Sequence, residues 1–285
     1  MNDSQHTPPA LDAWIGREET RHDRIDSRQA LALAATLDQN PDAVTQSGEL
    51  PPLWHWVYFT PATRRSELGH DGHPARGGFL PPVDLPNRMW AGGRLVFHRP
   101  LHLDEAVSRR SRIIRCERKR GRQGELVFVT VHHTLSGSDG PALEEEHDIV
   151  YRNPTPPGSA PAGEAAPAAA DFRQRVVADA VLLFRYSALT FNGHRIHYDH
   201  PYVTREEGYP GLVVHGPLTA TLLLEAFRKA HPDKTVRRFA FRAVGPLYDH
   251  QPFDVCGALD GPGTARLWTD CDGRLTMKAD VSFID

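Results

Sequence analysis

The stretch HGPLTATLLLEAFRKAHP, from His215 to Pro232, carries the clearest helical pattern in the sequence. Pro217 stands where a first-turn proline is tolerated, and Arg228 and Lys229 near the other end suit the negative end of the helix dipole. Large apolar residues cover most of the helix circumference, namely Leu218, Leu222, Leu223, Leu224 and Phe227. The stretch therefore predicts a helix that is buried on several sides.

Segments typical of β-strands lie on both sides of this helix in the sequence. RFAFRAVGPLYDHQPFDV (238–255), ARLWTDCD (265–272) and LTMKADVSFI (275–284) follow it. RLVFHRPLHLDEAV (94–107), SRRSRIIRCERKR (108–120) and ELVFVTVHHTLS (125–136) precede it. A second helix is expected over 26–40, with Asp or Ser as its cap. Buried helices and long antiparallel-type strands predict an α+β fold, in which a sheet curls around a helix.

The sequence divides at NPTPPGSAPAGEAAPAAA, residues 153–170, whose composition cannot form a packed core. Arg94 and Phe97 before this segment align with Arg238 and Phe241 after it, which is a weak sign of internal duplication. We expect a disordered N-terminus over 1–10, an N-terminal domain over 11–152, a Pro/Ala-rich linker over 153–170 and a C-terminal domain over 171–285.

Charge and composition argue against several classes of partner. The formal net charge of the 285 residues is −3, so it does not favour nucleic acid or anionic lipid. No apolar run approaches the roughly 20 residues that span a bilayer, and the first residues lack the pattern of a signal peptide. The three cysteines are widely spaced, without a CxxC motif. We expect a cytoplasmic protein that binds neither nucleic acid nor a membrane.

Histidines gather in FNGHRIHYDHPY, Phe191 to Tyr202, at positions 194, 197 and 200. A metal site is one interpretation, but no HExxH motif is present, and Gly193 and Pro201 argue against a regular helix. We therefore expect no metal here, and an acid–base site and a polar loop that is rich in histidine both stay open. GHDGHP, residues 69–74, is predicted to be a solvated loop.

The same stretch resembles the signature of the MaoC-like family of hotdog proteins, which includes R-hydratases and type 2 hydroxyacyl-thioester dehydratases. That signature runs approximately Ser/Thr-Gly-Asp-x-Asn-Pro-x-His-x-Asp, and TFNGHRIHYD, residues 190–199, takes its place here. VHG at 214–216 matches the start of the family's central helix. The wording FNGHRIHYD with GYPGLVVHGPL resembles in particular the branch of mesaconyl-CoA and itaconyl-CoA hydratases. The resemblance covers the second half well and the first half more loosely.

The resemblance implies a double hotdog, that is, two hotdog domains, each a curved antiparallel sheet around a central helix, with one working site at their interface. The N-terminal domain would be degenerate and the C-terminal domain catalytic. His197 would be the catalytic histidine, because an unperturbed pKa near 6.5 suits proton transfer in both directions. The backbone N–H of Gly216 would meet the thioester carbonyl at the helix N-terminus. Asp199 would be a loop or helix cap.

One catalytic position departs from the family pattern, because Asn192 stands where the family's usual aspartate does. An amide does not exchange a proton at neutral pH, but it can orient a water molecule. Three alternatives stay open: His197 makes both proton transfers through one water, another acid substitutes, or activity is weakened.

We expect the substrate to contact Arg195, His194, Val214, His215 and Trp56. Arg195 replaces the family's usual proline and can pair with a substrate carboxylate, although an ordinary surface salt bridge explains it equally. His215 has capping or packing as its alternative role. Trp56 belongs to the alternating run LWHWVYF, which forms either a wall of the acyl pocket or an aromatic core.

The function implied is that of an enoyl-CoA hydratase, equivalently a 3-hydroxyacyl-thioester dehydratase, which adds water across the C2=C3 bond. Mesaconyl-CoA and itaconyl-CoA, which are short, branched and dicarboxylic, represent the expected substrate class. No cofactor is implied apart from the coenzyme A of the substrate, and a homodimer of double hotdogs is one expected assembly. Two alternatives are a hotdog acyl-CoA thioesterase, which shares the fold and the oxyanion hole, and a non-catalytic acyl-CoA-binding subunit.

Overall fold

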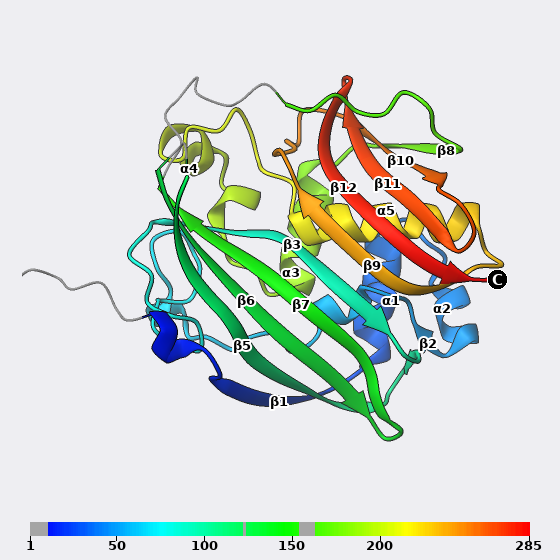
Figure 1. The fold of residues 1–285 in the computed structure, drawn as a ribbon, viewed down its shortest axis with the longest axis horizontal. Helices are drawn as coiled ribbons and strands as arrows, with labels where there is room; N and C mark the ends of the chain where they lie inside the picture. Colours follow the sequence, from blue (N-terminus) through cyan, green and yellow to red (C-terminus); the bar gives the residue numbers. More distant parts are fainter. Residues whose placement is uncertain (1–10, 122–123, 154–162) are drawn as a thin grey trace, which may run out of the picture.

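The computed structural model describes residues 11–121, 124–153 and 163–285. The segment 1–10, which the sequence predicts to be disordered, and residues 154–162 of the predicted linker therefore lie outside the described residues. A ten-stranded antiparallel sheet spans the molecule (Figure 1). From edge to edge its strands are β1 (Glu18–Arg24), β5 (Ala106–Gly121), β6 (Gly124–Gly137), β7 (Gly140–Arg152), β3 (Asn87–Phe97), β9 (Thr235–Ala243), β12 (Arg274–Ile284), β11 (Thr264–Cys271), β10 (Phe253–Leu259) and β8 (Phe172–Val176).

Strands β3 and β9 join the two halves of the sheet. They pair antiparallel, from Gly92 opposite Arg242 to Val96 opposite Arg238. These are the two runs that the sequence aligned as a duplication, and antiparallel pairing of equivalent strands is the arrangement that a two-fold relation produces. A side chain on Gly92 would overlap the carbonyl oxygen of Phe241, so the close pairing at this junction requires glycine.

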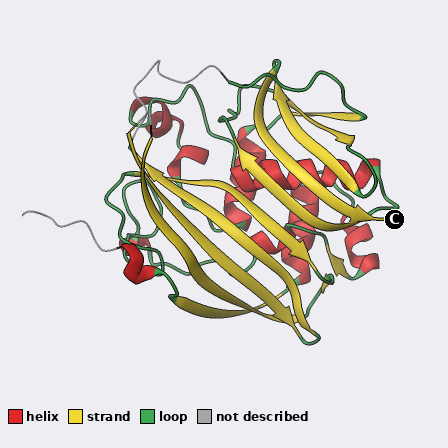
Figure 2. Ribbon diagram, in the orientation of Figure 1, coloured by secondary structure: helices red, strands yellow, loops and turns green. Residues whose placement is uncertain are grey.

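The longer helices lie behind the strands (Figure 2). Helix α5 (Gly216–Ala230) contacts β3, β8, β10, β11 and β12 and crosses behind the C-terminal strands in Figure 1. Its buried apolar residues include Leu218, Leu223 and Phe227, which confirms the predicted buried helix. The remaining elements are α1 (Ser27–Thr36), α2 (Pro41–Ser47), α3 (Ala180–Leu189), α4 (His200–Arg205), the 3₁₀ helices η1 (Leu11–Trp14), η2 (Trp54–Val57), η3 (Arg65–Glu67) and η4 (Arg195–His197), and the strand pair β2 (Glu49–Leu50) and β4 (Leu101–His102).

The helix predicted over 26–40 ends earlier than expected. Asp26 caps α1 by accepting from the backbone N–H of Arg28 at 2.8 Å, and the helix ends at Thr36. Asn40 instead caps the next helix, α2, by accepting from the N–H of Asp42 at 3.0 Å. The helix stops before the end of the predicted range because Asp38 takes a left-handed backbone conformation, with φ of 55°. Helix α2 then begins beyond that range.

The end of the predicted linker that the structure describes, residues 163–170, runs along the C-terminal half. The N–H of Ala166 donates to the carbonyl oxygen of Gly273, and the N–H of Leu275 donates to that of Glu164, both at 2.9 Å. This part of the Pro/Ala-rich segment is therefore attached to the turn between β11 and β12.

The inner face of the sheet, which turns toward the helices, differs between the halves. One row in register across nine strands consists of Glu19, Ser111, His133, Glu145, Leu95, Phe239, Val281, Ala265 and Leu259. From β1 to β7 its members are polar, and from β3 onward they are apolar. Of the apolar part, Leu95, Phe239, Val281 and Ala265 belong to the core that also contains α5, and Leu259 at the far end is exposed. The polar part must face something other than a dry core.

Candidate active site

A cavity of about 1430 Å³ lies where the two halves meet. The N-terminal half lines it with residues of β3, β5, β6 and β7 and with loop residues between 58 and 81. The C-terminal half lines it with residues between 187 and 198 and between 207 and 219, including the start of α5. The cavity therefore brings the histidine-rich stretch and the N-terminus of the central helix to one place.

His197 is held by the segment that leads into α5. The side chain is buried, at 7% exposure, and its Nδ1–H donates to the carbonyl oxygen of Val213 at 2.7 Å. The proton must be on Nδ1, because a carbonyl can only accept, and Nε2 therefore keeps its lone pair. Burial lowers the pKa of His197 to about 4. The ring is neutral at pH 7 and can accept a proton at Nε2.

His215 packs directly against His197. The two rings are stacked, with centroids 3.6 Å apart and planes 17° apart. Nε2 of His215 lies 2.8 Å from the hydroxyl of Ser187, and its buried Nδ1 has no hydrogen-bond partner in the described chain. Burial, followed by the charges of His197 and His194, lowers the pKa of His215 well below its ordinary value. His215 borders the cavity but also packs, as its alternative role predicted.

Helix α5 begins at Gly216 beside the cavity. The side chain of His215 makes no capping hydrogen bond, and within the described residues no acceptor meets the N–H of Gly216. A Cβ at Gly216 would lie 3.7 Å from the carbonyl oxygen of Trp90, so β3 passes close to the helix start. The unpaired N–H and the positive end of the helix dipole suit an oxygen that gains negative charge.

Asn192 shapes the loop that carries the histidines. Its Oδ1 accepts from the backbone N–H of His194 at 3.0 Å, and its own N–H donates to the carbonyl oxygen of Ser187 at 2.8 Å. The ring of His194 lies perpendicular to that of His197, with centroids 5.4 Å apart. Asn192, His194 and His197 all border the cavity, as the sequence predicted for a common site.

A loop from the N-terminal half closes on this group. Oδ2 of Asp71 lies 2.9 Å from Nδ1 of His73, and the ring of His73 lies 3.9 Å from that of His194. A side chain on Gly72 would overlap the carbonyl oxygen of Gly193, so the loops can touch only because glycine is present. The solvated loop predicted here is wrong for His73, which borders the cavity, because its contact partner is distant in sequence.

Asp71, His73 and His194 also form the one group among the described residues with ligand atoms close enough for a metal ion, all within 4.8 Å. Burial opposes ionisation of Asp71, but the hydrogen bond and charge of His73 outweigh it and keep its pKa below the usual range. The ionised carboxylate and Nδ1 of His73 satisfy one another without an ion. The absence of a metal stays a prediction from the sequence.

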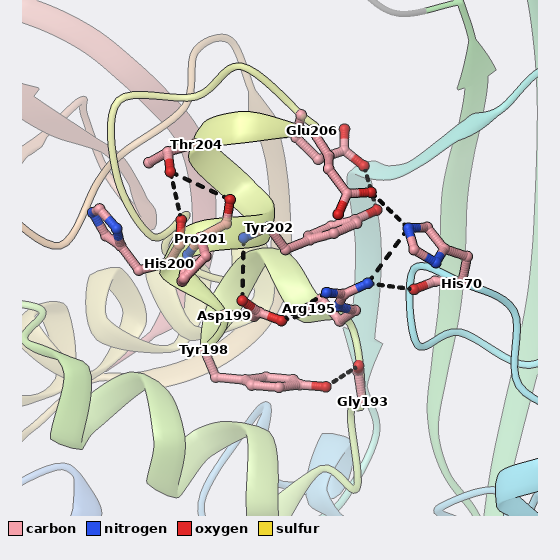
Figure 3. A network of polar contacts seen from close by, with 11 residues as sticks. His70, Gly193, Arg195, Tyr198, Asp199, His200, Pro201, Tyr202, Thr204 and Glu206 are labelled. Carbon is pink, nitrogen blue, oxygen red and sulfur yellow. Dashed lines mark hydrogen bonds and ion pairs between the residues drawn. The ribbon is translucent and has the colours of Figure 1, made fainter.

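Arg195 is not among the residues that border the cavity, and its contact with the substrate stays a prediction. Figure 3 shows its guanidinium beside Asp199 and His70. Its Nε and Nη2 bind Oδ2 of Asp199 at 3.0 and 2.9 Å. The guanidinium also donates to the carbonyl oxygen of His70 at 3.2 Å and lies 4.0 Å from the ring centre of Tyr202. The salt bridge that the sequence offered as the alternative is therefore present, because a carboxylate four residues later in the chain binds the guanidinium. Asp199 also caps α4, as predicted, by accepting from the N–H of Tyr202.

Val214 and Trp56 border the cavity, and their contacts with the substrate stay predictions. The N–H of Val214 donates to the carbonyl oxygen of Leu247 at 2.9 Å and so holds the approach to α5. Trp56 lies in η2, a 3₁₀ turn, although its neighbours alternate in the manner of a strand. Its Nε1 donates to Oε1 of Glu145 at 3.0 Å, and its ring packs edge-on against Trp90 at 4.9 Å.

Sequence analysis missed several cavity residues of the N-terminal half, among them Arg88, Trp90 and His147. Arg88 and Trp90 are on β3, and His147, on β7, stacks on Trp90 with ring centroids 3.9 Å apart. What marks them is that they lie on the inner face of the sheet, where the N-terminal half is polar. That signal can be read only once the strand register is known.

The two halves thus complete one site. The C-terminal half supplies a neutral histidine beside an open helix N-terminus, and the N-terminal half supplies the Asp71–His73 pair and a polar wall. Two curved half-sheets joined edge to edge around such a site define a double-hotdog enzyme that acts on an acyl thioester.

Known proteins identify the family. The family model of hydroxyacyl-thioester dehydratase type 2 matches residues 53–249, and the chain belongs to this family. The chain is 50% identical over 270 residues to a mesaconyl-C(4)-CoA hydratase of Chloroflexus aurantiacus, which covers 94% of this chain and 96% of the relative. It is 30% identical over 246 residues to a mitochondrial hydroxyacyl-thioester dehydratase type 2 of Schizosaccharomyces pombe, with 78% and 80% covered.

Solved structures share the fold. A MaoC-like dehydratase, 15% identical, has a TM-score of 0.73 with 96% of this chain and 99% of that chain covered. HtdX of Mycobacterium tuberculosis, 19% identical, has a TM-score of 0.68 with 93% and 99% covered. The predicted α+β double hotdog is confirmed, and the chain is a hydro-lyase of the hydratase and dehydratase class. In the part of the chain that the structure describes, no helix is long and apolar enough to cross a membrane.

Proposed function

We propose that this protein hydrates the C2=C3 bond of a short, branched, dicarboxylic enoyl-CoA of the mesaconyl type. One observation carries the proposed chemistry: the free Nε2 of His197 and the unpaired N–H of Gly216 border one cavity. Val213 links them, because its carbonyl oxygen accepts a hydrogen bond from Nδ1 of His197 and it lies three positions before Gly216 in the chain. The relative from Chloroflexus, half identical over 94% of this chain, supports the mesaconyl substrate.

In the proposed reaction, Nε2 of His197 takes a proton from a water molecule while the water oxygen bonds to C3. The electrons of the C2=C3 bond shift toward C2 and onto the thioester oxygen, which the N–H of Gly216 receives. The imidazolium of His197 then returns the proton to C2. A hydroxyl group is left on C3 and a hydrogen on C2, and His197 is neutral again. The balance is the addition of one water molecule, with no oxidation or reduction.

Asn192 holds a position next to this step without exchanging a proton. Its Oδ1 is engaged by the N–H of His194, whereas within the described chain its Nδ2 group has no protein partner and can donate to the attacking water. His73, whose Nδ1 is hydrogen-bonded to Asp71, packs against His194 and brings an imidazole to the site from the other half. In this proposal His197 makes both proton transfers, and Asp71 and His73 are positioning residues.

The test is turnover of mesaconyl-CoA, joined through carbon 4, by the purified protein. We expect the enoyl absorbance to fall while the thioester stays intact, with a kcat/KM well above that for crotonyl-CoA. His197→Gln should lower kcat by about 1,000-fold, because the base is lost. His200→Gln is the matched control, since His200 belongs to the same stretch but is exposed on α4, and it should change kcat by less than about twofold.

Other outcomes of the same assay identify other functions. Release of free coenzyme A with loss of the thioester would identify a thioesterase. Binding without turnover would identify an acyl-CoA-binding subunit. Equal rates with crotonyl-CoA and mesaconyl-CoA would remove the dicarboxylic preference but leave the hydratase assignment intact.

We also propose that the enzyme works in the cytoplasm and needs no cofactor beyond the coenzyme A of its substrate. The three cysteines are free and buried, which suits a reducing compartment. The homodimer of double hotdogs stays a prediction, which light scattering of the purified protein tests.

A further inference from the structure

The cavity carries a surplus of positive charge, although the chain as a whole does not. The described residues that border it include six arginines and two glutamates, whereas the net charge of the chain is −3. Both glutamates already have partners: Glu19 pairs with Arg21 at 3.0 Å, and Glu207 accepts from the hydroxyl of Tyr202 at 2.8 Å. The remaining positive charge fits an anionic ligand.

Arg88 is placed near the reacting end of the cavity by its strand. It is on β3, opposite Tyr151 of β7, and both residues border the cavity. Trp90, whose carbonyl oxygen adjoins Gly216, follows two residues later on the same strand. The rise of a strand puts the Cα atoms of these two residues about 7 Å apart. A long side chain at position 88 therefore reaches toward the space above the start of α5.

Neutral rings surround Arg88. Burial is the largest cause of the lowered pKa values of His73, His194 and His147, and the positive charge of Arg88 is among the smaller causes in all three. The hydroxyl of Tyr151 is its polar neighbour. In the described chain, no carboxylate lies within ion-pair distance of the Arg88 guanidinium. The protein thus holds a cation in its cavity without supplying the anion.

We propose that Arg88 binds the free carboxylate of a dicarboxylic enoyl thioester and so selects this substrate class over monocarboxylic enoyl thioesters. The inference rests on the proposed function. In a mesaconyl group joined to coenzyme A through carbon 4, the carboxylate is on the carbon that receives the hydroxyl group. Its partner must therefore stand beside the reacting atoms. The guanidinium fork matches the two oxygens of a carboxylate.

Two other arginines fit this role less well. Arg195 is already bound to Asp199 and does not border the cavity. Arg109 borders it, and its buried Nε has no partner among the described residues. However, Arg109 is on β5, which β6 and β7 separate from β3, so about 14 Å of sheet lies between the two strands. A carboxylate attached to the reacting carbon cannot be that far from Gly216.

Two unreactive analogues test the inference: methylsuccinyl-CoA joined through carbon 4, and isovaleryl-CoA, in which a methyl group replaces the carboxylate. Their dissociation constants are measured by titration calorimetry with the full chain and with Arg88→Gln. We expect Arg88→Gln to weaken methylsuccinyl-CoA about 100-fold and isovaleryl-CoA less than about threefold. Arg88→Lys, which keeps the charge but not the fork, should weaken methylsuccinyl-CoA about 10-fold.

Arg195→Gln is the matched control, and it should leave the ratio of the two dissociation constants unchanged. Circular dichroism and thermal unfolding check that each variant folds. If Arg88→Gln does not fold, the dissociation constants of Arg88→Lys still test the inference. Equal weakening of both analogues would assign Arg88 to the coenzyme A moiety or to the fold, and unchanged binding of both would exclude a contact. Either result overturns the inference.

The same titrations separate this inference from the proposed function. If the unmodified protein does not prefer methylsuccinyl-CoA, the dicarboxylic substrate class itself fails. If the preference is present and survives Arg88→Gln, the substrate class stands and Arg88 is not its determinant.

Discussion

The two halves of the sheet share one fold but present opposite inner faces. Leu95 and Phe239 pair at the centre of the row in register. On the C-terminal side the row continues through Val281 and Ala265, which pack in the core around α5. On the N-terminal side it continues through Glu145, His133 and Ser111. One half-sheet encloses a helix, and the other forms the wall of a cavity.

The polar wall is a satisfied network. Glu145 accepts from Nε2 of His55 and from Nε1 of Trp56, both at 3.0 Å. Burial alone would raise the pKa of Glu145. The hydrogen bond and charge of His55, with smaller contributions from His133 and His147, instead lower this pKa to about 2. Nδ1 of His133 lies 2.8 Å from the hydroxyl of Ser111. Such a network holds its polar side chains in fixed positions. The comparison teaches that the same fold serves as core or as binding surface, depending on which residues face inward.

Low pH should destabilise both halves, and we expect this to be the largest effect. Burial lowers the pKa of His147 in the wall and of His197 beside α5 to about 4, from 6.5. Between these pH values the unfolded chain binds more protons than the folded one, so the free energy of unfolding falls as the pH falls. A shift of this size corresponds to about 3 kcal/mol for each histidine. Thermal unfolding between pH 7.5 and 4.5 should show a steep decrease in Tm.

His147→Gln provides the control for this pH dependence. A glutamine does not titrate, so the decrease in Tm between pH 6.5 and 4.5 should be smaller than in the unmodified protein. A Tm that stays constant over this range would contradict the neutral state of His147.

Removing the charge of Glu145 should disrupt only the hydrogen-bond network of the N-terminal half. In Glu145→Gln a side-chain amide faces the donors of His55 and Trp56, so we expect the free energy of unfolding to fall by about 3 kcal/mol. Glu146, the next residue, lies on the outer face, where it is 38% exposed and pairs with Arg94. Glu146→Gln should cost less than about 1 kcal/mol. Urea unfolding measures both, and equal losses would show that the inner network contributes nothing particular.

The smallest effect is expected at the contact between the two halves, where Asp71 orients His73 against His194. Asp71→Asn should lower kcat about 10-fold with little change in KM, because the ring next to the site loses its fixed orientation. Glu206→Gln is the control, since Glu206 contacts the exposed His70 of the same loop at 2.6 Å. Steady-state kinetics on mesaconyl-CoA compares the two, and similar values of kcat for both variants would exclude a positioning role for Asp71.

Local patterns predicted the elements of the catalytic half. The periodicity and end residues of 215–232 predicted α5, and the resemblance of 190–199 and 214–216 to the MaoC-like signature placed His197 and Gly216 in one site. Asp199 was recognised as a cap because capping involves neighbours a few residues away. For Arg195 the sequence left a substrate contact and a salt bridge equally open, and the structure shows the salt bridge to Asp199, four residues later. Asp71 and His73 were left in solvent because their partners follow more than a hundred residues later.

The sequence by itself predicted the central helix, because helical periodicity acts over a few residues. Its likeness to the MaoC-like signature, which is also a local pattern, pointed to His197 and Gly216 in the C-terminal half. Only the tertiary structure decided that Arg88, His73 and the polar wall share a cavity with His197. Those neighbours are set by the register of ten strands and by the contact of two loops at Gly72 and Gly193. Contacts of such long range leave no local pattern in the chain.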